Sequence, residues 1–222
     1  YKYGNKNVIE DLLRLSNENT GHSTPYLYLG KLYEEYKNYD KAKKYFLEAA
    51  KYSTNMLDKI NFSCLAAVSL KNNKKYAEGR ELLLALFKEI GSSSYQEQYE
   101  LFKSLANIEL EASSFDNYFA LAEKALYLNP SDDALRFQLA HNYYQKAHHE
   151  LSLYHYKILC NTSPDSGNWN NVGVEFAELN LNGKAVSAYK KSEEMGGTTA
   201  VGNLANKLID AGFLEEARSR VE

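Results

Sequence analysis

The sequence predicts an all-α fold built from stacked antiparallel helix pairs, and three observations lead to this prediction. A small residue on an apolar helical face recurs at intervals of 37, 39, 34, 33 and 32 residues. Apolar residues within each interval lie three and four positions apart, which is the spacing of one face of a helix. The chain has 222 residues but only 3 prolines, and proline interrupts helices.

The first helix of each predicted pair is marked by the recurring small residue. The small residues are Gly30, Ala67, Ala106, Ala140, Gly173 and Ala205. The positions three residues later hold Tyr33, Leu70, Glu109, Tyr143, Phe176 and Leu208. All of these except Glu109 are large and apolar, so this face is expected to pack against neighbouring helices. The small residues predict the places where two helices approach most closely.

The second helix of each pair begins after a short polar break. The breaks contain Asn38, Asn72-Asn73, Ser113-Ser114, Asn182-Gly183 and Gly212. Twelve positions after each small residue stand Ala42, Gly79, Tyr118, Ser152, Ala185 and Ala217, of which only Tyr118 is large. Pro130 and Pro164 are expected to end second helices. A lone hairpin cannot bury its apolar face, so the pairs are predicted to stack on one another.

The whole pattern resembles the tetratricopeptide repeat, whose unit of 34 residues carries a W-x2-L-G-x2-Y…A-x3-F…P signature. The closest matches are Tyr26-Leu29-Gly30-Tyr33…Ala42…Phe46 and Trp169-Val172-Gly173-Phe176…Ala185…Tyr189. The resemblance implies a right-handed superhelical solenoid with units at 23–56, 60–93, 99–132, 133–165, 166–197 and 198–222. We expect Phe46, Trp169 and Tyr189 to be core residues. The long early intervals and the exceptions Glu109 and Tyr118 predict irregular packing in the third unit.

The segment 1–22 fits the second helix of a truncated upstream repeat. Val8, Leu12 and Leu15 occupy the three apolar slots of such a helix, in register with the unit that begins near residue 23. The chain begins with Tyr1, and its last residues continue a helical pattern without a stop signal. These features predict that the chain is a fragment of a longer protein.

Composition and motifs narrow the class of function. The net charge of −3 argues against a general binder of nucleic acids, and no apolar run is long enough to span a membrane. Cys64 and Cys160 lie too far apart for a metal motif and are expected to be buried free thiols, which suits a cytoplasmic protein. His141, His148, His149 and His155 lack the spacing of zinc ligands. No motif of an enzyme or a cofactor site is present, so we expect a protein that is not an enzyme and needs no cofactor.

The resemblance to the tetratricopeptide family implies a peptide or protein partner held in a concave groove lined by the first helices. The expected groove residues are Lys103, Asn107, Phe137, Gln138, His141, Tyr144, Asn170, Asn171, Asn203 and Asn206. Six of them carry side-chain amides, which offer donors and acceptors: Asn107, Gln138, Asn170, Asn171, Asn203 and Asn206. These six look like the asparagine ladder with which some family members hold an extended peptide. Solvated amides on an exposed helix face are the alternative explanation of the same pattern.

The sequence bears on three further interpretations of the groove and of the array. Lys103 and Asn107 match the first residues of the family's carboxylate clamp, but Gln138, Gly167 and Asn171 stand where Asn, Lys and Arg are needed, so a clamp is not expected. The array could instead be a structural spacer or dimerisation arm in a larger signalling or enzymatic protein, which leaves a second copy of the chain open as a partner. An RNA-binding helical repeat is disfavoured by the negative net charge.

Overall fold

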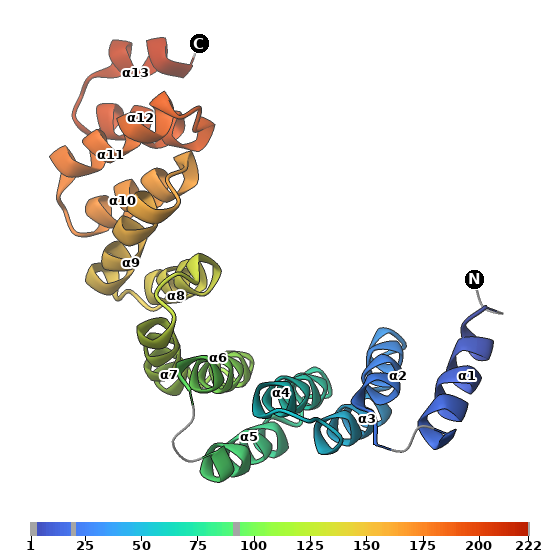
Figure 1. Cartoon of the computed structure of the whole chain (residues 1–222). Coiled ribbons are helices and arrows are strands. Elements are labelled where there is room, and N and C mark those ends of the chain that lie inside the picture. The colour runs from blue at the N-terminus through green and yellow to red at the C-terminus, as the bar shows by residue number, and fades with distance from the viewer. Residues whose placement is uncertain (1–3, 19–20, 91–93, 222) are drawn as a thin grey trace. The chain divides into compact units, whose positions relative to one another are not determined.

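The computed structural model describes residues 4–18, 21–90 and 94–221, and the regular elements of these segments are all α-helices (Figure 1). The predicted all-α class is therefore confirmed. The helices belong to two compact units, Tyr1–Asn129 and Pro130–Glu222. None of the helices in these described segments is long and apolar enough to cross a membrane.

The first unit contains one helix followed by three helical hairpins (Figure 1). Its helices are α1 (Gly4–Glu18), α2 (Ser23–Glu35), α3 (Tyr39–Lys51), α4 (Met56–Asn72), α5 (Tyr76–Ile90), α6 (Tyr95–Glu111) and α7 (Phe115–Leu128). The pairs α2–α3, α4–α5 and α6–α7 each pack through a short turn, and α4 packs against both α3 and α6. Each hairpin thus buries its apolar face partly within itself and partly against its neighbour.

The second unit contains three further hairpins with the same order of packing. Its helices are α8 (Asp133–Gln145), α9 (His149–Thr162), α10 (Ser166–Glu178), α11 (Asn182–Glu194), α12 (Thr198–Asp210) and α13 (Leu214–Val221). The second helices α9 and α11 pack against the first helices α10 and α12 of the hairpins that follow. As predicted, Pro130 and Pro164 lie just beyond the ends of α7 and α9.

One backbone motif joins the two helices of every hairpin. The residue after the first helix and its cap has a positive φ, and these residues are Lys37, Lys74, Ser113, Ala147, Asn180 and Gly212. In the α8–α9 turn, the Ala147 N–H donates to the Tyr144 carbonyl at 2.9 Å and the His148 N–H donates to the Tyr143 carbonyl at 2.9 Å. The other five turns repeat this pair of hydrogen bonds, which is the Schellman ending of a helix. The same backbone hydrogen bonds therefore stabilise turns whose left-handed position holds residues as different as Lys37, Ala147 and Gly212.

The turn between α10 and α11 differs from the sequence prediction. Asn182 and Gly183 were expected to form the break, but Asn182 is the first residue of α11, and Asn180 holds the left-handed conformation at φ 60°. An asparagine tolerates this conformation better than most residues do. The predicted break therefore lies two residues too far toward the C-terminus.

The core confirms the close approach predicted at two of the small residues. A Cβ atom added to Gly30 would lie 2.5 Å from Cδ1 of Phe46, and one added to Gly173 would lie 2.4 Å from Cδ1 of Tyr189. Phe46 and Tyr189 are buried, as expected, with exposures of 2% and 3%. Trp169 packs against the core cluster of the second unit but is only partly buried, and the Lys191 ammonium lies 4.2 Å from its ring centroid. It is therefore a core contact, although not a fully buried one.

The longer early repeats and the exception at Glu109 have simple structural causes. Helices α4 and α6 each have 17 residues, whereas α2, α8, α10 and α12 have 13, so the additional residues extend the first helices. The buried Glu109 carboxylate accepts hydrogen bonds from both Nε and Nη2 of Arg80 on α5. This guanidinium holds the pKa of Glu109 below its usual range. Tyr118, the other exception, is completely buried on α7.

The helix α1 packs against α2, but its apolar residues are unevenly covered. Leu12 is partly buried, whereas Val8 and Leu15 are 45% and 38% exposed. The three slots predicted for residues 1–22 therefore do not form a closed core face among the described residues. The assignment of this segment to an upstream repeat stays a prediction.

Candidate functional site

Eight of the ten predicted groove residues lie in the second unit, on its three first helices. Phe137, Gln138, His141 and Tyr144 are on α8, Asn170 and Asn171 on α10, and Asn203 and Asn206 on α12. All eight are exposed or partly exposed, whereas the residues beside them, such as Leu139, Val172 and Leu204, are buried. The helical period places the two sets on opposite sides of each helix.

The other two predicted residues, Lys103 and Asn107, lie on α6 of the first unit. The Lys103 ammonium donates a hydrogen bond to the Tyr99 hydroxyl at 2.9 Å and lies 5.3 Å from the centroid of the same ring. Lys103 is therefore engaged by its own helix. The candidate site is built from the residues of the second unit.

Four predicted residues come together around one pocket of about 370 Å3. Phe137, His141 and Tyr144 contribute from α8, and Asn171 contributes from α10. The remaining lining residues, which the sequence analysis did not name as site residues, are Tyr156 from α9 and Val174 and Glu175 from α10. The first helices of two successive hairpins, α8 and α10, form the walls, and α9, which lies between them in the chain, supplies Tyr156.

The aromatic side of this pocket is formed by packed rings. Phe137 and Tyr156 meet edge to face with ring centroids 5.7 Å apart. Tyr156 is 3% exposed, while Phe137 is 45% exposed and stands at the rim. Such edge-to-face pairs add to the stability that area burial supplies. Tyr156 is thus held rigidly by the hydrophobic cluster that also contains Ala140 and Leu159.

The acidic side of the pocket is the carboxylate of Glu175, which is 1% exposed. Its Oε2 lies 2.9 Å from Nδ1 of His149, and its Oε1 accepts a hydrogen bond from the Ser152 hydroxyl. Burial raises the pKa of Glu175, and the two hydrogen bonds act in the opposite direction. Burial also raises the pKa of Tyr156, with a further contribution from the negative charge of Glu175. The pocket lining therefore includes aromatic rings and a residue whose buried carboxyl group is held by Ser152 and His149.

This arrangement does not form a catalytic triad of serine, histidine and glutamate. The hydroxyl of Ser152 points to Glu175 and to the Ala140 carbonyl, 2.9 Å away, while His149 contacts the other carboxylate oxygen. A nucleophilic serine needs the histidine as its own hydrogen-bond partner. Ser152 is also completely buried, so its hydroxyl is a structural group.

The amide side chains form one direct bridge between repeats. The Asn203 side-chain N–H donates to Oδ1 of Asn170 at 2.8 Å, which links α12 to α10. Asn171, the neighbour of Asn170, lines the pocket instead. The predicted ladder is therefore partly closed on itself, although each of the bonded amides keeps further donors or acceptors.

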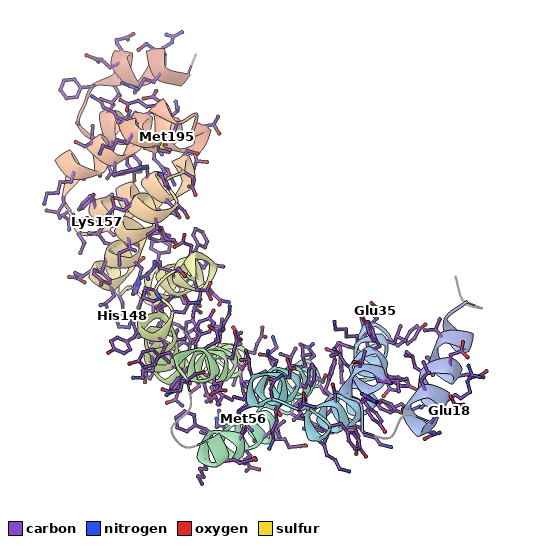
Figure 2. All side chains as sticks on the ribbon, viewed as in Figure 1. Glu18, Glu35, Met56, His148, Lys157 and Met195 are labelled. Carbon is purple, nitrogen blue, oxygen red and sulfur yellow. The ribbon has the colours of Figure 1, made fainter. Side chains whose placement is uncertain are left out.

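The histidines of the second unit have separate environments. His141 lines the pocket, His149 contacts Glu175, and His155 is buried with its ring stacked on Tyr143 at 5.8 Å. Figure 2 shows His148 at the turn that joins α8 to α9. Within the described segments, no three His, Cys, Asp or Glu side chains come close enough to hold a metal ion.

Solved structures with a similar arrangement of helices include tetratricopeptide proteins. YrrB, described as a TPR protein with an unusual peptide-binding site, superposes with a TM-score of 0.58 at 16% identity, over 84% of this chain and 93% of its own. The MamA protein gives a TM-score of 0.59 at 16% identity, over 80% and 93%. The sequence itself matches no family model and no curated protein. At these identities the likeness shows the fold, so the chain is a tetratricopeptide-like helical repeat.

Proposed function

We propose that this tetratricopeptide-like chain is a protein-interaction scaffold that binds an extended peptide segment along α8, α10 and α12. The observation that carries the proposal is the pocket in which Phe137, His141, Tyr144 and Asn171 meet. Their spacing in the sequence points to one exposed face, and the fold brings them around one cavity. The peptide-binding site named for YrrB, a protein of the same fold, supports the proposal.

An extended segment suits the chemistry of this surface. Its backbone presents one N–H and one C=O per residue, and asparagine amides pair with both groups. Asn170 and Asn203 are already bonded to each other, so they offer their remaining hydrogen-bonding atoms at a fixed position. A partly exposed ring such as Phe137 supplies the apolar anchor that interfaces favour. Binding is expected to change no covalent bond.

Selection from a displayed library of unstructured twelve-residue peptides, with the full chain as bait, tests the proposal. The affinity of selected peptides is then measured by fluorescence anisotropy for the wild type and for Phe137→Ala and Asn171→Ala. Phe137→Ala is expected to weaken binding by about tenfold or more, the loss typical of an interface anchor. Asn171→Ala is expected to have a smaller effect, because the amide contributes hydrogen bonds alone.

The matched control is Tyr154→Ala on α9, which removes a ring that is 59% exposed and does not line the pocket. This variant should bind as the wild type does. Selected peptides that bind Phe137→Ala and wild type equally would place the binding surface elsewhere. A library that returns no peptide above background would also contradict the proposal.

Self-association is a second candidate function, favoured by apolar exposure on the hairpin of α12 and α13 and on the turn between them. Ile209, Phe213 and Leu214 are 50%, 52% and 62% exposed. A dimerisation arm would bury these side chains against a second copy. Light scattering over a range of protein concentrations distinguishes the two functions, since a dimer that Leu214→Glu converts to a monomer would support the arm.

A further inference from the structure

The pocket on the second unit combines aromatic walls with a buried negative group. Of its seven lining residues, three are aromatic, one is a carboxylate and none is lysine or arginine. The aromatic rings are those of Phe137, Tyr144 and Tyr156. The faces of aromatic rings carry negative electrostatic potential, which attracts cations that lie above them. The composition of the lining therefore distinguishes this pocket from a purely apolar anchor site.

The electrostatics of the surrounding groups point in the same direction. Burial raises the pKa of Glu175, whereas hydrogen bonds from Ser152 and His149 and the charge of His149 act in the opposite direction. The neighbours of its carboxylate are the hydroxyl of Ser152 and the imidazole of His149. The three aromatic rings and the acidic residue of the lining thus suit a positively charged guest.

We propose that the pocket receives the positively charged side chain of a lysine or arginine in the bound peptide. This inference rests on the proposed function and specifies the chemistry of its ligand. A cationic head group would lie against the rings of Phe137, Tyr144 and Tyr156 and close to the acidic residue Glu175. A neutral side chain would lack this electrostatic attraction, and an acidic side chain would be repelled by the negative faces of the rings.

The size and openness of the site agree with such an occupant. A volume of about 370 Å3 accommodates a long side chain, and Phe137 and His141 are both exposed at the rim. The methylene stem of a lysine or arginine would pack on Phe137 while its charged end lies deeper, near Tyr156 and Glu175. One peptide residue would therefore be selected by charge, while the neighbouring amides bind its backbone.

Small amides of single amino acids test the charge preference on the full chain without a known partner. The probes are the N-acetyl N-methylamides of lysine, arginine and norleucine, titrated into 15N-labelled protein and followed by NMR. Norleucine has the length of lysine without the charge. The two cationic probes are expected to shift signals of α8 and α10 in a saturable manner, with affinities about tenfold above that of norleucine.

Charge variants at the exposed rim separate the electrostatic effect from changes in folding. His141→Lys should lower the affinity for the lysine probe by up to about fivefold. His141→Glu should raise this affinity by a similar factor, as expected for exposed charge pairs. The matched controls Leu151→Lys and Leu151→Glu add the same charges at a residue that is 44% exposed and outside the pocket. These controls should leave the affinity unchanged.

The outcomes separate this inference from the proposed function. Equal affinities for norleucine and lysine, or equal effects of the substitutions at 141 and 151, would overturn the cation preference. Selected peptides that bind along α8, α10 and α12 but tolerate norleucine at their basic position would retain the peptide-binding function and reject the cation. Saturable cation binding without any selected peptide would retain the pocket's charge preference and reject the extended ligand.

Discussion

Gly173 on α10 lies against the ring of Tyr189 on α11, and replacing it with alanine tests how tightly a hairpin is packed. The added Cβ would lie 2.4 Å from two ring carbons of Tyr189, which is 3% exposed. Carbon atoms normally keep about 3.5–4.0 Å apart, so either the ring or α10 must move by about 1 Å. Such overpacking costs about 1–3 kcal/mol. Alanine also gains about 1 kcal/mol over glycine in a helix, which partly offsets this loss.

Gly202 on α12 supplies the control, because a Cβ added there meets nothing within 4 Å. Gly202→Ala should therefore stabilise the protein by about 1 kcal/mol. We expect Gly173→Ala to be less stable than Gly202→Ala by about 1–3 kcal/mol in urea denaturation. The double variant Gly173→Ala/Tyr189→Leu, which copies the Ala67 and Leu83 pair of an earlier hairpin, should recover part of the loss. Equal stability of the two alanine variants would refute the close-packing argument.

Three further predictions concern the turns, the buried ion pair and the thiols. Ala147→Gly should raise the free energy of unfolding by about 1 kcal/mol, since residue 147 has a φ of 58°; an unchanged thermal midpoint would contradict this. Arg80→Ala should destabilise the protein by about 1–3 kcal/mol at pH 7 by leaving Glu109 buried without its partner. Because the pKa of Glu109 is lowered in the folded protein, this stabilisation is present above the ordinary glutamate pKa of about 4.3 and is lost as pH falls through the lower folded value. Urea midpoints of wild type and Arg80→Ala should thus converge in acid. Burial raises the pKa of Cys64 to about 12 and that of Cys160 to about 11, so a thiol reagent at pH 8 should label neither until the protein is denatured.

The sequence was sufficient to predict the helical hairpins because small and apolar side chains recur at the repeat period, and these side chains pack against residues nearby in the chain. The sequence was less informative about the turns. These are stabilised by backbone hydrogen bonds, and residues as different as Lys37, Ala147 and Gly212 adopt the same left-handed conformation in them. The partner of Glu109 was also not predictable from a helical pattern. Arg80 lies 29 residues earlier on the second helix of a different hairpin, and only the stacking of hairpins brings the two together.

The candidate site was predictable on one side only. The exposed face of α8 and α10 follows from helical period, and Phe137, His141, Tyr144 and Asn171 were found in this way. Glu175 was missed because a buried acid on a helix with this period looks like an ordinary polar position. Its burial depends on Ser152 and His149 from α9, which no spacing within α10 reveals.

Tyr156 was missed for a different reason, which links packing to the site. Tyr156 and Tyr189 occupy the same position of successive repeats, but the first helix opposite them carries Ala140 in one case and Gly173 in the other. The ring of Tyr189 fills the space that a methyl group at Gly173 would need. Ala140 has that methyl group, and Tyr156, which belongs to the same core cluster as Ala140, also lines the pocket. The two repeats thus differ by one methyl group at this position, that of Ala140. The ring of Tyr189 fills the core, whereas the ring of Tyr156 also forms part of the candidate binding surface.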